Sequence, residues 1–424
     1  MKSKLLVVII ILLSISPLNA QQTKGITADT NWFANWTNFS PSTTVYKPTS
    51  QTLVGIIDKD LKLTKNNTYK LVGTVYITNK AVLSIEPGTV IRGEKESCGT
   101  LVITKGCKII AEGTATEPIV FTSNSNPTYR RPGDWGGIII LGEAPINKVG
   151  GVNNLDFNLE SDISFYGGND VNSNSGILKY VRIEYSGHKI NALKELNGLS
   201  LAGVGNGTKF DFIQISFSND DSFEAYGGEV NFNHLISFRA TDDDFDFTQG
   251  VQCTISNSVA IRNPFSSDRS GSRCFEIDSY DVITNADMSK KLTKITASNI
   301  TLTNTEDNNQ GLVREAVYIR DNSYLNINNS LVDGFSCCVL LENKIITLPT
   351  NLEKINIQGM QVNRCNGVVL SENTIFNREL ANWYNSDTFA IDVTKLTKTE
   401  LFINSDMKEY PDLRTRNTNP IVSK

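Results

Sequence analysis

Histidine is nearly absent from this chain, and its scarcity excludes several classes of enzyme. Of 424 residues, only His188 and His234 are histidines. Two are too few for a histidine-rich zinc site and leave little room for a Ser-His-Asp triad. A basic excess is also lacking, because 40 Lys and Arg stand against 45 Asp and Glu, for a net charge of −5. The chain therefore lacks the basic character that a general nucleic-acid binder needs to neutralise phosphates.

Cysteine is too scarce for a disulfide scaffold in a chain of this length. The seven cysteines form no CxxC pair, and their odd number leaves at least one unpaired within the chain. We expect most of them to be small apolar residues of the core. Cys98 and Cys107 are the only candidate bridge.

Long hydrophobic runs are confined to the start of the sequence. Lys2 and Lys4 precede an apolar run at residues 5–15, and Ala20 ends a short polar stretch after it. This pattern predicts a signal peptide over residues 1–20, cleaved after Ala20. We therefore expect an exported protein of the periplasm, the cell surface or the extracellular space, with no transmembrane segment in the mature chain.

Amphipathic helices are lacking from residues 53–372, where short β-branched runs alternate with turns. The sequence repeats itself there. Residues 220–224 (DDSFE) recur as 242–246 (DDDFD), a shift of 22, and residues 327–343 match 357–373 at a shift of 30. Units of twenty to thirty residues made only of short strands cannot bury their own apolar faces, so they stack and share one core.

The repeats predict an all-β fold, a single-stranded right-handed parallel β-helix of the pectate-lyase-like kind. A sandwich or propeller is the alternative, but it would need regularly spaced two-residue hairpin turns, which are scarce here. We expect the β-helix to occupy residues 53–375. Segments without the repeat predict an N-terminal cap at 21–52 and a C-terminal cap at 376–424, with a short helix at 377–383.

Five motifs between residues 35 and 246 point to one family. They are 35–41 (NWTNFSP), 83–93 (LSIEPGTVIRG), 109–123 (IIAEGT, then PIVFTS), 133–142 (GDWGGIIILG) and the acidic repeats at 220–246. Together they resemble exported right-handed parallel β-helix proteins that are common in Bacteroidetes-type bacteria and mostly uncharacterised. The resemblance implies the fold and export, and it implies no reaction.

Carboxylates are concentrated in two consecutive repeats. They are Asp220, Asp221 and Glu224 on one coil, and Asp242, Asp243, Asp244 and Asp246 on the next. If Phe223 and Phe245 point inward, Glu224 and Asp246 point outward. Neighbouring coils lie about 4.8 Å apart, and two carboxylates at that distance repel by about 3–4 kcal/mol. The sequence therefore predicts a compensating partner for these acids, or their exposure to water.

Three kinds of compensation are open. Ca²⁺ can be bound by several oxygen ligands, Arg239, Arg262 or Arg273 can form ion pairs, or a raised pKa can keep an acid protonated. Alternatively, the aspartates cap turns and face water, where screening weakens their repulsion. If the protein is an enzyme, the candidate catalytic residues are Asp244 and Asp246 together with the three arginines.

Two aromatic residues in turn-like segments, Trp135 and Tyr226, are candidates for stacking on a sugar. The function that we favour is non-enzymatic binding of a polysaccharide or another cell-surface component, with Ca²⁺ as the candidate cofactor. A Ca²⁺-dependent polysaccharide lyase and a glycoside hydrolase are the enzymatic alternatives, because β-helices similar to pectate lyases and polygalacturonases perform such chemistry. A structural or adhesive solenoid is a third hypothesis.

Overall fold

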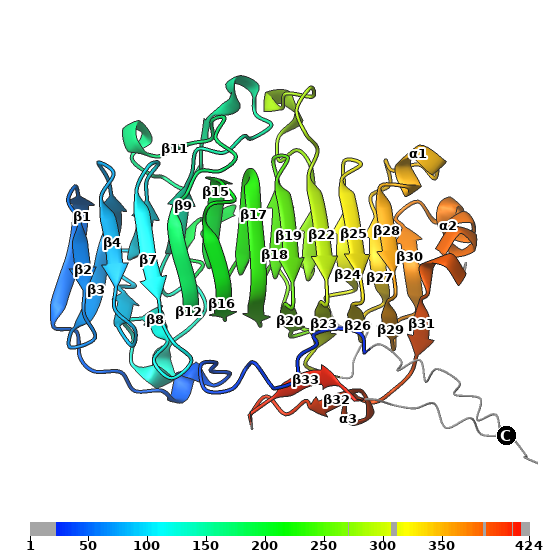
Figure 1. Ribbon diagram of the computed structural model, residues 1–424, viewed down its shortest axis with the longest axis horizontal. Helices are drawn as coiled ribbons and strands as arrows, with labels where there is room; N and C mark the ends of the chain where they lie inside the picture. Colours follow the sequence, from blue (N-terminus) through cyan, green and yellow to red (C-terminus); the bar gives the residue numbers. More distant parts are fainter. Residues whose placement is uncertain (1–22, 270, 307–311, 385–386, 409, 417–424) are drawn as a thin grey trace, which may run out of the picture.

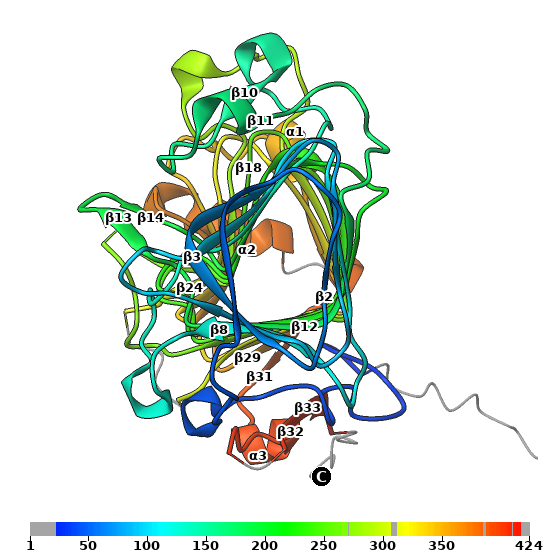
Figure 2. The same ribbon diagram turned by 90° about the vertical axis from the view of Figure 1, so that its left-hand side faces the viewer.

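The protein is a parallel β-helix, as the repeats predict. The computed structural model describes residues 23–269, 271–306, 312–384, 387–408 and 410–416, so the predicted signal peptide at 1–20 lies outside the described residues. Successive coils stack along the long axis of the molecule (Figure 1). Seen along that axis, the strands surround a common core (Figure 2).

Each coil contributes to three parallel sheets, which we call the first, second and third sheet. The first sheet contains β2 (Leu61–Leu63), β4 (Val82–Ile85), β7 (Lys108–Glu112), the beginnings of β12 (Gly176–Glu184) and β16 (Lys209–Ser216), the middle of β17 (Phe223–Phe238), β19 (Gln252–Ser256), β22 (Lys294–Ser298), β25 (Tyr324–Asn328) and β28 (Ile355–Gln358).

The second sheet continues from the first at each corner of the coil. It contains the beginnings of β1 (Gln51–Ile57) and β3 (Thr68–Ile77), β5 (Val90–Gly93), β8 (Ile119–Ser123), the ends of β12, β16 and β17, β20 (Val259–Arg262), β23 (Thr301–Asn304), β26 (Leu331–Asp333), β29 (Gln361–Asn363) and β31 (Asp392–Thr394).

The third sheet completes the coil and carries the acidic repeats. It contains the ends of β1 and β3, β6 (Thr100–Ile103), β9 (Gly137–Leu141), β15 (Leu199–Val204), the beginning of β17, β18 (Phe245–Thr248), β21 (Phe275–Ile277), β24 (Glu315–Ile319), β27 (Cys337–Leu341) and β30 (Gly367–Ser371).

The observed register matches the predicted repeats. Phe223 pairs with Phe245, which is the shift of 22. Val339 pairs with Val369, which is the shift of 30. Apolar side chains that alternate along each strand point inward and stack from coil to coil, so one continuous core runs the length of the solenoid.

Insertions interrupt the coils on both sides of the third sheet. Residues 142–175 and 278–293 connect the third sheet to the first, and residues 185–198 and 263–274 connect the second sheet to the third. These insertions carry two short antiparallel pairs, β10 (Asn153–Asn154) with β11 (Phe165–Tyr166) and β13 (Lys189–Asn191) with β14 (Lys194–Glu195). The outer face of the third sheet is therefore flanked by loops.

The segment predicted as an N-terminal cap lies along the side of the solenoid. Phe33, Trp36 and Phe39 are buried against the outer face of the second sheet, and the rings of Phe39 and Phe238 meet edge to face at 5.1 Å. The described part of this segment runs past several coils before it enters β1 (Figure 1). The segment therefore covers a side of the solenoid. The loss of the repeat had suggested a cap over its end instead.

The C-terminal end of the core is covered by a helix. α2 (Asn377–Tyr384) lies where the sequence predicts a helix, and Leu380 and Tyr384 are buried in the core cluster. Tyr384 Oη donates a hydrogen bond of 2.9 Å to the carbonyl oxygen of Ile355. The solenoid itself extends beyond the expected limit at residue 375, because β31 still pairs with β29.

The last described residues join the N-terminal segment on the second sheet (Figure 2). They form α3 (Lys398–Leu401), β32 (Phe402–Asn404) and β33 (Asp412–Thr415). Asn31 Nδ2 donates a hydrogen bond of 2.8 Å to the carbonyl oxygen of Pro411. The remaining described helices are α1 (Pro349–Leu352) and the 3₁₀ turns Pro41–Thr43, Pro127–Tyr129, Val149–Gly151, Ser161–Ile163, Ile283–Asn285, Thr374–Phe376 and Asp387–Phe389. Within the described ranges, no helix combines the length and apolar composition needed to cross a membrane.

All seven cysteines carry free thiols, and five of them are buried. The expectation that most are core residues is confirmed. The candidate bridge between Cys98 and Cys107 is wrong, because the two side chains lie on opposite faces of the third sheet. Cys98 packs with the cluster outside that sheet, whereas Cys107 belongs to the core inside it.

We expect the native protein to react slowly with an aromatic disulfide reagent such as DTNB. Burial raises the pKa of the Cys253, Cys274 and Cys338 thiols, and the thiolate is the reactive form. After unfolding in guanidinium chloride without reductant, all seven thiols should react. A count of five in the unfolded chain would reveal a disulfide and contradict this arrangement.

Candidate functional site

The acidic repeats lie at the beginning of β17 and β18, on the outer face of the third sheet. Phe223 and Phe245 point into the core, where their rings stack with centroids 5.0 Å apart. Because side chains alternate along a strand, Glu224 and Asp246 point outward, and these two residues are paired in register. Glu276 of β21 pairs with Asp246 and extends the row. The predicted orientation of this row is confirmed.

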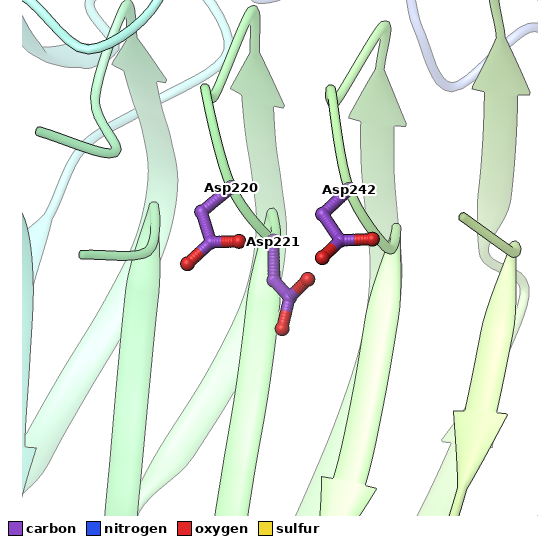
Figure 3. Close-up of side chains that lie close together, drawn as sticks. All are labelled: Asp220, Asp221 and Asp242. Carbon is purple, nitrogen blue, oxygen red and sulfur yellow. The ribbon is translucent and has the colours of Figure 1, made fainter. Parts of the chain in front are cut away.

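The turns that precede the two strands bring further carboxylates together. Side chains of Asp220, Asp221 and Asp242 point toward one another (Figure 3), and one oxygen from each lies within 4.8 Å of the others. A second set consists of Asp221, Glu224 and Asp246, with the same spacing. Asp221 belongs to both sets, so the five carboxylates form one cluster, which we call the acidic site.

The acidic site has no cationic partner within the part of the chain that the structure describes. None of its five carboxylates forms an ion pair there. Asp221 Oδ1 accepts a hydrogen bond of 2.9 Å from the backbone N–H of Asp243. Glu224 accepts hydrogen bonds from Tyr226 Oη and Asn197 Nδ2. Oδ1 of Asp242 and Oδ1 of Asp246 are buried and have no hydrogen-bond partner among the described residues.

Burial makes ionisation of these acids costly. It raises the pKa of Glu224 to about 8 and that of Asp242 to about 7. Burial, followed by the neighbouring carboxylates, also holds the pKa values of Asp220, Asp221 and Asp246 well above their usual range. At neutral pH the acidic site therefore binds protons, or it needs a cation in their place.

Arg262 forms an ion pair with one acid only among the described residues, and that acid lies outside the acidic site. Its Nη1 is 3.0 Å from Asp244 Oδ2, and both side chains are 0% exposed. Ser237 Oγ also donates to Asp244. Asp244 and Arg262 therefore form a buried ion pair beneath the surface, which argues against a direct catalytic role for either of them.

The other two arginines are placed differently from each other. Arg273 bonds Glu276 and Glu315, each at 3.0 Å, and its backbone N–H donates to Asp243. Asp243 is itself buried. Arg239 forms no ion pair with the described acids, and its guanidinium lies 5.4 Å from the ring centre of Phe238. Ion pairing therefore accounts for Asp244 and Glu276, and it leaves the acidic site without an ion pair among the described residues.

Trp135 lies in the core and is 0% exposed. Its ring stacks on Phe121 with centroids 6.4 Å apart, and Nε1 donates a hydrogen bond of 2.8 Å to the carbonyl oxygen of Glu184. The GDWGG motif therefore supplies a core residue at a corner of the coil. This placement corrects the assignment of Trp135 as a sugar-binding residue.

Tyr226 lies next to the acidic site, and its hydroxyl donates a hydrogen bond to the carboxylate of Glu224. Asn197 donates to the same carboxylate and was not anticipated. The register of the third sheet places it there, because Leu199 pairs with Phe223 and Asn197 therefore lies one coil before Asp221. Asp278 was also missed. It follows β21, and burial raises its pKa to about 7.

Comparisons with known proteins agree with the fold. A family model described as a pectate-lyase-like β-helix domain matches residues 55–405. No curated protein matches the sequence. Among solved structures, the enzymatically active domain of tailspike protein 2 from bacteriophage CBA120 is similar at 10% identity, over 78% of this chain and 42% of that one, with a TM-score of 0.26.

A second similar structure is full-length tailspike protein 2 from Escherichia coli O157:H7 bacteriophage CAB120. It shows 10% identity over 78% of this chain and 38% of that chain, with a TM-score of 0.24. This chain thus spans about two-fifths of the length of either tailspike. TM-scores of this size carry no argument about function.

The match to the family model covers most of the chain. It takes in the coils from β2 to β31 and both turns of the acidic site. More than half of the chain lies inside it. The chain therefore belongs to the family of pectate-lyase-like β-helix domains.

Proposed function

We propose that the protein is exported to the periplasm, the cell surface or the extracellular space, where it binds a polysaccharide or another surface component without cleaving it. The binding is Ca²⁺-dependent. The observation that carries the proposal is the acidic site itself, in which two sets of three carboxylates share Asp221 and have no cationic partner among the described residues.

Calcium suits this arrangement better than a softer metal. Ca²⁺ takes about six to eight oxygen ligands and prefers carboxylates and carbonyls, and each of the two sets supplies three carboxylates. The buried oxygens of Asp242 and Asp246 that have no donor are available for such a cation. A bound cation also offsets the mutual repulsion of carboxylates on adjacent coils.

A cation in the acidic site would remain accessible to a ligand. Asp220, Glu224, Asp242 and Asp246 are half-buried, so each set reaches the outer surface. Hydroxyl and carboxylate oxygens of a polysaccharide are hard ligands, which can complete the coordination of Ca²⁺. The stacked coils and the loops that flank the third sheet support an elongated ligand over a small one.

We expect millimolar CaCl₂ to raise the melting temperature of the chelator-treated protein by about 3–8 °C, because a ligand that binds only the folded state stabilises it. Asp221→Asn should remove most of this shift, since Asp221 belongs to both carboxylate sets. The matched control is Asp58→Asn, an exposed aspartate of the first coil. Differential scanning fluorimetry checks the effect, and an equal shift in wild type and Asp221→Asn would contradict the proposed site.

Ligand binding is tested separately from ion binding. A panel of acidic and neutral polysaccharides, with CaCl₂ or with chelator, should show Ca²⁺-dependent retention of the wild type and loss of retention for Asp221→Asn. Retention that survives both the chelator and the substitution would show that the acidic site does not bind the polysaccharide.

A glycoside hydrolase is the second candidate function, and Glu224 favours it. With a pKa of about 8, its carboxyl group is protonated at neutral pH and can donate a proton to a glycosidic oxygen. Asp246 on the adjacent strand would be the second carboxyl group, and it would have to ionise against the burial that raises its pKa. A lyase is less well supported, because it needs a basic arginine. Arg262 and Arg273 are engaged in ion pairs, and the guanidinium of Arg239 lies over the Phe238 ring. Release of reducing ends by the wild type, abolished in Glu224→Gln, would replace the non-enzymatic proposal.

A further inference from the structure

We propose a second binding site, which takes a single acidic sugar residue, in a cavity where the third sheet turns into the first. The cavity has a volume of about 180 Å³ and is separate from the acidic site, which lies at the opposite end of the same strands. Its lining includes Pro145, Ile146, Asn147 and Glu229, with Lys290 and Lys291 from a second loop.

Two glycines let the loop at 142–149 approach the coils closely enough to enclose this space. Gly228 and Gly250 have φ angles of 87° and 79°, in the region that favours glycine. A Cβ at Gly250 would lie 3.0 Å from Nδ2 of Asn147 in this loop and 2.5 Å from the carbonyl oxygen of Lys291. The Gly228 N–H donates a hydrogen bond of 2.8 Å to the carbonyl oxygen of Pro145. The cavity is thus held by backbone contacts.

Asn147, a residue of the lining, has a buried acceptor that is not used. Its side chain is 2% exposed, and Nδ2 donates a hydrogen bond of 2.7 Å to the carbonyl oxygen of Ser279. Oδ1 is buried and has no partner among the described residues. Buried polar atoms are nearly always hydrogen-bonded. A ligand hydroxyl that donates to Asn147 Oδ1 would satisfy this atom.

The size and the walls of the cavity indicate a single sugar ring as the ligand rather than an oligosaccharide. Sites for drug-sized molecules measure about 300–1,000 Å³, well above this cavity. Pro145, Ile146 and Val171 provide an apolar wall, against which the C–H face of a sugar ring can pack. Apolar walls combined with a few polar groups are typical of small-ligand sites.

The charges around the cavity select an anionic ring. Lys290 and Lys291 are exposed and form no ion pair with the residues that the structure describes. Glu229 is the one acid of the lining, and it accepts a hydrogen bond of 3.3 Å from Asn206 Nδ2. Asp287 attracts Lys290 but lies outside the lining. Within the lining, two ammonium groups against one carboxylate favour a ligand with a carboxylate, as in a uronic acid.

The site is tested with methyl β-D-glucuronide and its neutral counterpart, methyl β-D-glucoside, by saturation-transfer NMR and titration. We expect saturable binding of the glucuronide and weaker binding of the glucoside. The double variant Lys290→Ala/Lys291→Ala should weaken glucuronide binding about tenfold, as expected for loss of a charge-assisted contact. Val171→Trp should abolish binding of both sugars, because the indole fills the cavity.

Controls separate this site from the proposed function. Lys59→Ala/Lys62→Ala removes two exposed lysines of the first coil and should leave binding unchanged. Chelator and Asp221→Asn should have no effect, since the cavity contains no residue of the acidic site. Absence of saturable binding in the wild type, or binding that Val171→Trp leaves unchanged, would overturn the site. Equal binding of both sugars would overturn its preference for an acid.

Discussion

Replacing Arg262 with methionine is expected to lower the free energy of unfolding by about 3–5 kcal/mol. Methionine keeps much of the arginine's volume and removes its charge, which leaves Asp244 without a counterion in a site where both side chains are 0% exposed. Arg262 Nη1 also donates a hydrogen bond of 3.0 Å to the carbonyl oxygen of Arg273, so this oxygen loses one of its two donors and keeps only the N–H of Asp244. Chemical denaturation of the purified variant measures the effect.

A second substitution distinguishes the lost charge pair from simple loss of packing. Arg262→Met/Asp244→Asn removes the orphaned charge, and we expect it to recover at least about half of the lost stability, because a neutral amide is far cheaper to bury than a carboxylate. Arg131→Met, at an exposed position, is the matched control and should change stability by less than about 0.5 kcal/mol. A loss below about 1 kcal/mol for Arg262→Met would contradict the buried pair.

In the presence of chelator, the melting temperature is expected to fall by about 5–10 °C between about pH 5 and about pH 9. Burial raises the pKa of Glu224 to about 8 and those of Asp242 and Asp278 to about 7. The folded state thus holds protons that the unfolded chain has already released above about pH 4. The stability that these acids contribute is therefore fully present below about pH 4, declines as the pH rises above it, and is lost once the pH has passed through 7 to 8.

Calcium should reverse this dependence. The cation binds the ionised carboxylates, so its stabilising effect grows as the pH rises, and the decline seen in chelator should shrink or disappear. Glu224→Gln/Asp242→Asn removes two of the raised groups and should flatten the chelator curve. A flat curve for the wild type in chelator would mean that the acids are ionised throughout, contrary to their buried environment.

The solenoid could be predicted because its information is local and repeated. The shifts of 22 and 30 residues reappear as strand registers in the third sheet. Alternation within each strand then decides which side chain faces the core, so the inward phenylalanines and the outward Glu224 and Asp246 follow from a few residues each. The clustering of Asp220, Asp221 and Asp242 follows from the same stacking.

Features that depend on the segments between strands were not predictable in this way. The N-terminal segment lacks the repeat, and this absence suggests a cap at the end of the solenoid. In the structure, its aromatic residues pack on the second sheet instead. Trp135 sits at a corner of the coil, and local sequence does not say on which side of the chain its ring lies. Cys98 and Cys107 are close in sequence, yet the third sheet separates them.

The arrangement of charge shows most clearly which features the sequence predicts and which depend on the folded structure. Sequence was sufficient to place an excess of carboxylate on two adjacent coils, because equal spacing in a repeat becomes equal spacing in space. Only the folded chain decides which acid receives an arginine. Arg262 lies on the second sheet and reaches Asp244, whereas Asp221 and its neighbours receive none among the described residues. Such pairing depends on depth and side-chain direction across different coils, and burial then sets the energy of every unpaired charge.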